Sequence, residues 1–207
     1  MKGSLVVLEG GEACGKSTQA ARLAQRLGAV LTREPGGTAM GERIRALVLD
    51  HAAAGLVPRA EALLMAAARA QHVAEVVAPA LAAGRHVVSD RFTGSSLGYQ
   101  GYGRGLSVDE LRVLSHFATD GVEADVVVLL QLDPAIAAAR RARRLDRLEA
   151  AGAGFHRRVA EGFAALAAAD PHRWVSVDGG GDEDEVAERV WSTVSTRLLR
   201  PIEAAEG

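Results

Sequence analysis

The 207-residue sequence lacks several features that would place it in a particular class of protein. Its single cysteine, Cys14, excludes an intrachain disulfide and a metal site built from cysteines. No apolar run approaches the roughly 18 residues that span a bilayer, and the N-terminal segment lacks the length and cleavage site of a signal peptide. The net charge of −2 provides no overall attraction to nucleic acid or to anionic membranes. We therefore expect a cytoplasmic protein with no nucleic-acid or membrane partner.

Three residue types are also scarce. The sequence contains no asparagine, and only 4% of its residues are aromatic, so its core must consist mainly of Leu, Val and Ala. Of the 24 basic residues only two, Lys2 and Lys16, are lysines, and the rest are arginines. A lysine at a position where a binding motif requires one is therefore informative in this chain.

Short apolar segments alternate with helical patterns along the chain. The predicted strands cover residues 5–9, 29–32, 86–90, 125–132 and 174–178. The predicted helices cover residues 16–27, 41–50, 59–83, 107–119, 134–145, 156–169 and 183–199. Because parallel strands need crossover connections, this alternation predicts an α/β fold: a five-stranded parallel sheet with helices on both faces. No repeat or linker interrupts it, and we expect a single domain over residues 1–207.

The segment after the first predicted strand matches the pattern G-x-x-x-x-G-K-[ST]. It consists of Gly10, Gly11, Glu12, Ala13, Cys14, Gly15, Lys16, Ser17 and Thr18. Glycines let backbone N–H groups surround phosphate oxygens, and the helix that follows adds partial positive charge. Lys16 is placed to reach the β- and γ-phosphates of ATP, and Ser17 to hold Mg²⁺. The pattern predicts an ATP-binding loop; the alternative is a glycine-rich turn without a ligand.

Asp90 and Arg91 stand at the end of the predicted strand 86–90. Since ligands of such sheets bind at the carboxyl ends of the strands, Asp90 is a candidate for binding Mg²⁺ through water and Arg91 for facing phosphates. The alternative for Asp90 is a helix cap or turn former. The absence of asparagine excludes the N-K-x-D segment with which GTPases recognise guanine. A kinase of small molecules is the expected class.

Four further motifs, taken together, resemble those of the bacterial thymidylate kinase family. They are Thr-Arg-Glu-Pro-Gly-Gly-Thr at 32–38, Asp-Arg-Phe at 90–92, Ser-Ser-Leu-Gly-Tyr-Gln-Gly at 95–101 and Leu-Asp-Arg-Leu-Glu at 145–149. The resemblance extends over about residues 4–200. It implies a P-loop kinase fold, a homodimer, and transfer of the γ-phosphate of ATP to dTMP with Mg²⁺, giving dTDP for dTTP biosynthesis.

The resemblance also implies roles for residues that hold the phosphate and sugar of dTMP. Arg45 and Arg91 match the arginines that hold its phosphate, a task suited to bidentate guanidinium pairing. Glu12 matches an acidic residue that contacts the 3′-hydroxyl. Tyr99 matches the ring beside the 2′ position, where it would exclude a ribose hydroxyl.

A second set of residues is implied at the base. Arg69 matches the residue that hydrogen-bonds the thymine carbonyl, and Ser96 and Gln100 match polar groups near the base edge. Met65 stands where the family usually stacks a phenylalanine on thymine. Met65 thus either covers the base or only fills the core beside the helix 59–83.

An arginine-rich stretch, residues 140–147, contains five arginines in eight residues. A solvated helix face or an RNA-binding patch would explain it without catalysis, although the aromatics that stack on RNA bases are absent. The resemblance implies a lid at about 140–152 whose Arg143 or Arg144 acts with Lys16 and Arg91 in catalysis. Ala13, which is small where other members have an arginine, agrees with a lid arginine in that role.

Two other functions stay open at this point. One is a P-loop kinase of a different nucleoside monophosphate or small metabolite. The other is a nucleotide-dependent switch or nucleic-acid-binding ATPase that uses the arginine-rich stretch on a polymer.

Overall fold

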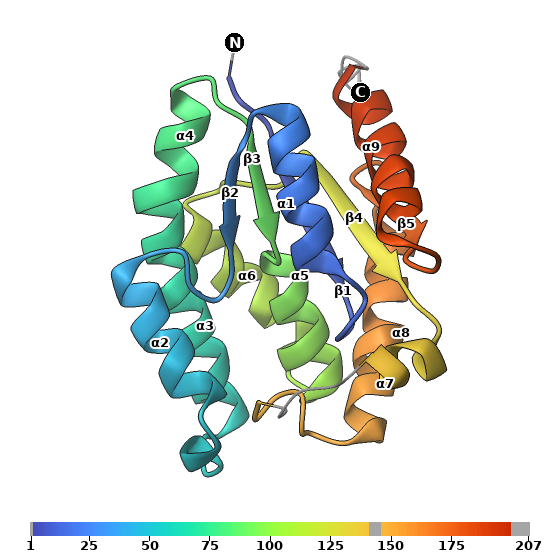
Figure 1. Ribbon diagram of the computed structural model, residues 1–207. Helices are drawn as coiled ribbons and strands as arrows, with labels where there is room; N and C mark the ends of the chain where they lie inside the picture. The colour runs from blue at the N-terminus through green and yellow to red at the C-terminus, as the bar shows by residue number, and fades with distance from the viewer. Residues whose placement is uncertain (1, 141–145, 200–207) are drawn as a thin grey trace.

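Five parallel strands form one sheet in the computed structural model, which describes residues 2–140 and 146–199 (Figure 1). They are β1 (Leu5–Gly10), β2 (Val30–Arg33), β3 (Val87–Asp90), β4 (Val126–Gln131) and β5 (Trp174–Asp178), in the order β2-β3-β1-β4-β5. The predicted strands are confirmed, with every end within one residue of its predicted position. The α/β fold class is confirmed with them.

The helices follow the strands in the expected alternation. Their bounds are α1 Lys16–Leu27, α2 Ala39–Leu49, α3 Pro58–His72, α4 Ala78–Ala82, α5 Thr93–Ser96, α6 Val108–Thr119, α7 Pro134–Arg140, α8 Ala153–Ala169 and α9 Glu183–Leu199. Shorter segments are the 3₁₀ helix η1 (His51–Ala53) and the π-helical η2 (Val73–Val77) and η3 (Leu97–Gly103). The helix predicted over 59–83 is therefore α3, η2 and α4 in succession. Residues 141–145 of the helix predicted over 134–145 lie outside the described residues.

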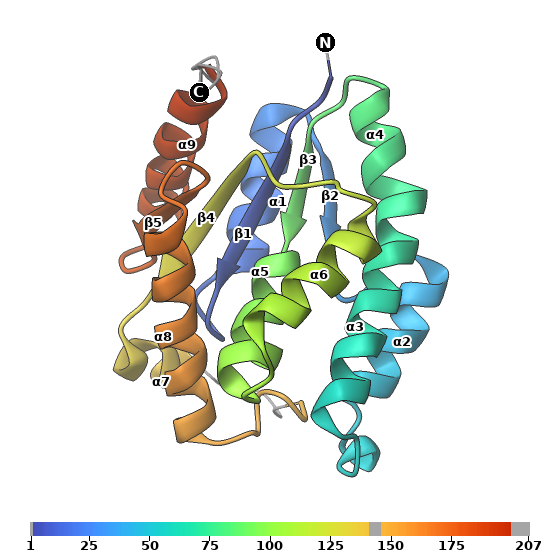
Figure 2. The same cartoon turned by 180° about the vertical axis from the view of Figure 1, so that it is seen from behind.

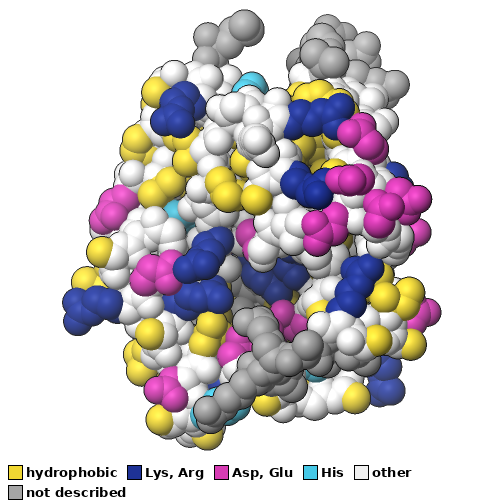
Figure 3. Space-filling view, viewed as in Figure 1, with side chains coloured by type: hydrophobic (Ala, Val, Ile, Leu, Met, Phe, Trp, Pro, Cys, Tyr) yellow, Lys and Arg dark blue, Asp and Glu magenta, His cyan; other side chains and the backbone are white. Residues whose placement is uncertain are grey.

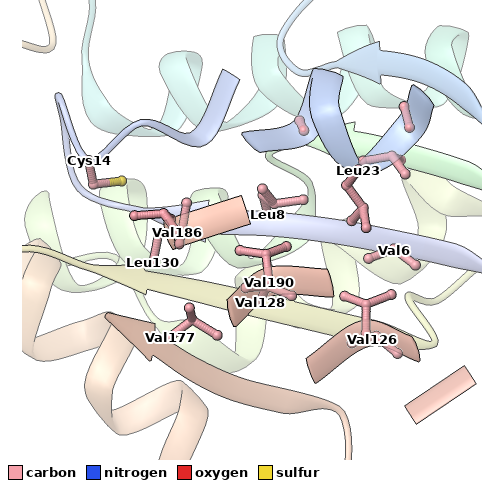
Figure 4. Close-up of a cluster of buried hydrophobic side chains, with 14 residues drawn as sticks. Val6, Leu8, Cys14, Leu23, Val126, Val128, Leu130, Val177, Val186 and Val190 are labelled. Carbon is pink, nitrogen blue, oxygen red and sulfur yellow. The ribbon is translucent and has the colours of Figure 1, made fainter. Parts of the chain in front are cut away.

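Helices cover both faces of the sheet because its strands are apolar on both sides. Val6 and Leu8 of β1 pack with α1 and α9 on one face (Figure 4). Leu5 and Val7 point the opposite way and pack with η2 and α4 on the other face, which also carries α6 and α8 (Figure 2). Alternation along β1 thus buries its side chains on both sides, as a central parallel strand requires.

The helical segment 93–103 was not predicted, because glycine is a poor helix former and this stretch contains four glycines. Tertiary packing overrides the propensity here. A Cβ at Gly103 would lie 2.6 Å from the Phe155 ring, and one at Gly162 would lie 2.5 Å from the Tyr102 ring. The glycines therefore let η3 and α8 approach closely.

Replacement of Gly162 by alanine tests this close packing. We expect Gly162→Ala to lower the free energy of unfolding by about 1–3 kcal/mol, because the new methyl group overpacks the contact with Tyr102. The matched control is Gly154→Ala in the same helix, whose Cβ would meet nothing nearer than Arg158 Nη1 at 3.8 Å. This control should be neutral or gain up to about 1 kcal/mol in helix propensity. Urea unfolding compares the two; equal midpoints would contradict the packing argument.

Candidate active site

The phosphate loop runs from the end of β1 to the first turn of α1. Gly15 caps α1 in the left-handed conformation (φ 91°), and a Cβ at Gly10 (φ 144°) would lie 2.5 Å from the Leu130 carbonyl oxygen. Both positions therefore require glycine. Lys16 is buried, and its Nζ donates to the Gly11 carbonyl at 2.5 Å, so the ammonium lies over the loop. The N-terminus of α1 and this ammonium together make a site for an anion.

Ser17 and Asp90 meet beside the loop, as predicted. Ser17 Oγ donates to Asp90 Oδ2 at 2.5 Å, joining α1 to the end of β3. The other carboxylate oxygen, Oδ1, is buried and has no hydrogen-bond partner among the described residues. A hydroxyl and a carboxylate with an uncommitted oxygen are the hard oxygen donors that Mg²⁺ prefers. The two residues therefore fit a magnesium site.

Arg91, Glu12 and Tyr99 form a compact polar cluster on the other side of the loop. Arg91 Nη2 donates to Glu12 Oε1 at 2.7 Å, and the Tyr99 hydroxyl donates to the same oxygen. Burial acts to raise the pKa of Glu12, but the charges of Arg91 and Lys16 and the bond from Tyr99 outweigh it and lower the pKa to about 2. Burial raises the pKa of Tyr99 well above its ordinary value. The cluster therefore consists of an ionised carboxylate, a cation and a neutral phenol.

Glu9, the last side chain before the phosphate loop, holds the segment that carries Arg91. It is completely buried and accepts hydrogen bonds from the Phe92 backbone N–H at 3.0 Å, the Ser95 N–H at 2.8 Å and Ser95 Oγ at 2.6 Å. Ser95 Oγ in turn accepts a hydrogen bond from Arg91 Nη1 at 3.2 Å. Arg91 itself has a positive φ of 75°, a costly conformation for a residue with a side chain. The bonds of Glu9 help to maintain it.

Arg69 is held by an equally buried set of contacts. Its Nε donates to Glu34 Oε2 at 2.8 Å, and its Nη2 donates to the Phe92 carbonyl and to Ser96 Oγ, both at 3.0 Å. His72 lies 2.9 Å from the second Glu34 oxygen through Nδ1. Arg69 is only 3% exposed, yet it lines the pocket, so its guanidinium presents donors from a rigid frame.

A pocket of about 500 Å³ adjoins the phosphate loop at the carboxyl ends of β1 and β3. All eight predicted substrate residues line it: Glu12, Arg45, Met65, Arg69, Arg91, Ser96, Tyr99 and Gln100. From the predicted ATP-binding loop the lining includes Glu12, Ala13, Gly15, Lys16, Ser17 and Thr18, but not Gly10, Gly11 or Cys14. Basic side chains gather around this part of the surface (Figure 3). The structure thus brings the predicted substrate residues together.

Met65 lies where both interpretations of this residue stay open. It lines the pocket and also packs with Val48 and Leu148 in a small apolar cluster. Leu148 comes from the Asp-Arg-Leu-Glu motif, and Asp146 and Glu149 of that motif line the pocket with it. Of the predicted lid, Arg140 also lines the pocket, whereas Arg143 and Arg144 lie outside the described residues.

Sequence reasoning missed the buried carboxylates that hold the functional side chains. Glu9, Glu34 and Glu61 are at most 5% exposed, and each hydrogen-bonds a residue at or near the pocket. Nothing in its local sequence separates Glu61 from a surface glutamate, whereas Glu34 stands within the motif at 32–38 without an assigned role. The only available signal for Glu9 was its place at the end of a fully apolar strand.

Among residues 2–140 and 146–199, no helix is long and apolar enough to cross a membrane. The same residues contain no cluster of three or more His, Cys, Asp or Glu side chains that would hold a metal ion by themselves. A phosphate loop, a magnesium-compatible pair and an arginine-lined pocket lie at one edge of the parallel sheet. Fold and site together define a nucleotide-binding phosphotransferase of the P-loop kinase class.

The family model for thymidylate kinase matches residues 8–190, and the chain belongs to the thymidylate kinase family. It is 52% identical over 202 residues to the thymidylate kinase of Synechococcus sp. (strain JA-3-3Ab), with 95% of this chain and 98% of that protein covered. The thymidylate kinase of Deinococcus radiodurans is 48% identical over 203 residues, with 95% and 98% covered. The crystal structure of thymidylate kinase from Ehrlichia chaffeensis superposes with a TM-score of 0.79 at 28% identity, covering 94% of this chain and all of that one.

The depressed pKa of Glu12 predicts a pH dependence of stability. Its folded-state pKa of about 2 lies below the ordinary 4.5, so ionised Glu12 stabilises the fold above pH 4.5 and this stabilisation is lost as the pH falls toward 2. Between pH 6 and pH 3.5 the wild type should lose about 1 kcal/mol more unfolding free energy than Glu12→Gln, which has no proton to bind. Urea unfolding of both proteins at the two pH values measures the difference. Equal losses would show that Glu12 is not held ionised.

Proposed function

We propose that this protein transfers the γ-phosphate of ATP to the 5′-phosphate of dTMP, giving dTDP and ADP for dTTP biosynthesis in the cytoplasm. The observation that carries the proposal is the pocket in which the phosphate loop adjoins Arg45, Arg91 and Arg69. A phosphate acceptor bound by these arginines would lie next to the phosphate loop, which binds the donor. Membership of the thymidylate kinase family supports dTMP as that acceptor.

On the donor side, the loop and Lys16 bind the phosphates of ATP. Lys16 Nζ, which donates to the Gly11 carbonyl, would exchange that partner for phosphate oxygens and stabilise the charge that develops during transfer. Ser17 and Asp90 would hold Mg²⁺, which neutralises phosphate charge when bound. Transfer needs positioning and charge stabilisation, and no covalent enzyme intermediate is required.

On the acceptor side, Arg45 and Arg91 would hold the dTMP phosphate. Arg91 would then lie between the two substrates, because it donates to the Gly10 carbonyl of the phosphate loop at 3.3 Å and to Glu12, the proposed sugar contact, at 2.7 Å. Glu12 would accept from the sugar 3′-hydroxyl, and the Tyr99 ring would exclude a 2′-hydroxyl. Both residues are already held close to each other by their shared hydrogen bond.

The base would lie deeper in the pocket. Arg69 would donate to a thymine carbonyl from its fixed position, with Ser96 and Gln100 near the base edge. Met65 would cover the base with its thioether, and such sulfur–aromatic contacts contribute about 0.3–1.5 kcal/mol.

The stretch 140–152 is proposed as a lid. Four described residues of this stretch, Arg140, Asp146, Leu148 and Glu149, line the pocket, which supports a lid over the site. Arg143 or Arg144 would bring a further positive charge to the transferring phosphoryl group.

The homodimer has a candidate surface on α3 and α6, which pack against each other (Figure 2). Their outer sides expose large apolar side chains: Leu63 at 59%, Val113 at 72% and Phe117 at 85%. Exposed apolar patches of this kind are typical of protein–protein interfaces. Burial between two copies of the chain would remove these side chains from water.

A coupled assay with ATP and dTMP tests the activity, and Lys16→Ala tests the site. We expect the variant to lower kcat by roughly 10²–10³-fold, because Lys16 meets charge that grows during transfer. Lys2→Ala, which removes the only other lysine, an exposed one, is the matched control and should keep full activity. Unchanged turnover of Lys16→Ala would refute the site assignment. Phosphorylation of dCMP or AMP in preference to dTMP would instead favour another nucleoside monophosphate kinase.

The proposed dimer surface is tested by Phe117→Asp. A charge at this exposed position would oppose burial against a second copy, so sedimentation velocity should show a monomer where the wild type shows a dimer. Ile136→Asp on α7, which is 44% exposed and lies away from α3 and α6, is the control and should stay dimeric. A dimeric Phe117→Asp variant would place the interface elsewhere.

A further inference from the structure

Glu61 on α3 is a buried carboxylate that takes no direct part in the proposed phosphoryl transfer. It is 0% exposed, and its Oε1 accepts from Gln100 Nε2 at 2.9 Å. Arg104 donates to both of its oxygens at 3.3 and 3.2 Å, and Arg147 Nη2 donates to Oε2 at 2.5 Å. Burial acts to raise the pKa of Glu61, but the bonds from these three side chains outweigh it and lower the pKa. Glu61 is therefore an ionised group that can only accept hydrogen bonds.

This carboxylate determines which way the Gln100 amide faces. An amide has a donor end and an acceptor end that are nearly identical in shape, so its orientation is set by its partners. Because Glu61 accepts only, the NH₂ group of Gln100 must face it, and a flipped amide would set a carbonyl oxygen against a carboxylate. Gln100 Oε1 accepts no hydrogen bond from any described side chain, and Gln100 lines the pocket. The polar atom left for a ligand is thus an acceptor.

An acceptor beside the donors of Arg69 matches one class of base edge. Thymine presents a carbonyl oxygen next to its N3–H donor, which pairs with a guanidinium and an amide oxygen respectively. Cytosine presents an amino donor next to an unprotonated N3, so both contacts would be mismatched. A flipped Gln100 amide would remove one of these two mismatches, so the site would discriminate less between thymine and cytosine.

We propose that Glu61 is a specificity-determining positioning residue, whose carboxylate locks the Gln100 amide with its oxygen toward the base and so favours a pyrimidine with an N3–H over cytosine. This role rests on the proposed dTMP kinase activity. Arg104 and Arg147 hold the carboxylate in place, and Arg147, which also donates through Nε to the Val48 carbonyl at 2.7 Å, follows the proposed lid arginines in the chain.

The test compares kcat and KM for dTMP and dCMP in the wild type and in Glu61→Gln. The introduced side-chain amide would both donate and accept, so the Gln100 amide could adopt either orientation. We expect the dTMP-to-dCMP ratio of kcat/KM to fall roughly tenfold, because a flipped Gln100 removes one of the two mismatches that disfavour cytosine. KM for dTMP should rise roughly threefold with kcat within about twofold, because the base contact is similar in the ground and transition states.

A double variant that exchanges the two side chains, Glu61→Gln with Gln100→Glu, provides the rescue. The amide introduced on α3 would donate to the carboxylate introduced on η3. The second oxygen of that carboxylate would again be an acceptor toward the base, so the ratio should return to within about threefold of the wild type. Arg104→Gln is the matched control: it removes one partner of Glu61 but leaves the bond to Gln100, and the ratio should not change.

Each result decides the inference. An unchanged ratio in folded Glu61→Gln, or the same loss in Arg104→Gln, would overturn it, because the effect would then be absent or merely structural. Should thermal unfolding show that Glu61→Gln does not fold, the double variant carries the test, and loss of discrimination in the folded double variant overturns the inference. Wild-type protein that does not phosphorylate dTMP would refute the proposed function itself, and that measurement comes first.

Discussion

The parallel pairing of β1 with β3 decides where the charged groups of the site lie. In this register Leu8 stands opposite Asp90, so both strands end at the same level of the sheet. The phosphate loop leaves β1 there, and Arg91 follows β3 there. The Ser17–Asp90 and Arg91–Glu12 hydrogen bonds join residues 73 and 79 positions apart in the sequence, and both follow from this one pairing. Without this pairing, the phosphate loop after β1 and the Asp90–Arg91 segment at the end of β3 would not lie next to each other.

Buried carboxylates around the pocket hold the side chains that face a ligand. Glu9 holds the segment after β3, Glu34 holds Arg69, and Glu61 holds Gln100. Burying a charge is costly, and removing one partner of a buried pair typically costs about 3–5 kcal/mol. For Glu34 and Glu61 the same cost makes the arrangement rigid, because an arginine that moves away leaves a charge unpaired. Glu9 instead holds its segment through hydrogen bonds from two backbone N–H groups and a hydroxyl. Donors and acceptors held in this way need little reorganisation when a substrate binds or reacts.

The glycine-rich segment 93–103 links the packing of the molecule to the geometry of the pocket. It carries Ser96, Tyr99 and Gln100 into the pocket, and it can do so only because its glycines let it lie close against α8. Aromatic rings of α8 and η3 meet edge to face across this contact. The centroid of the Tyr99 ring lies 6.0 Å from that of Phe155 and 6.1 Å from that of Phe163. Packing of η3 against α8 therefore positions the side chains of Ser96, Tyr99 and Gln100 that line the pocket.

The sequence by itself determined the sheet, the phosphate loop and the set of residues around the pocket. Strands 5–10 and 126–131 are largely apolar, and the spacing of Gly10, Gly15 and Lys16 is a local pattern, so both can be recognised without knowing what lies nearby. The resemblance over Ser96 to Gln100 selected residues that the structure places around the pocket. Only the tertiary structure decided the rest: that residues 93–103 are helical against α8, that Met65 both lines the pocket and packs with Leu148, and that Glu61 is a buried partner of Gln100. These outcomes depend on contacts between residues far apart in the chain, and local propensity and periodicity carry no information about such contacts.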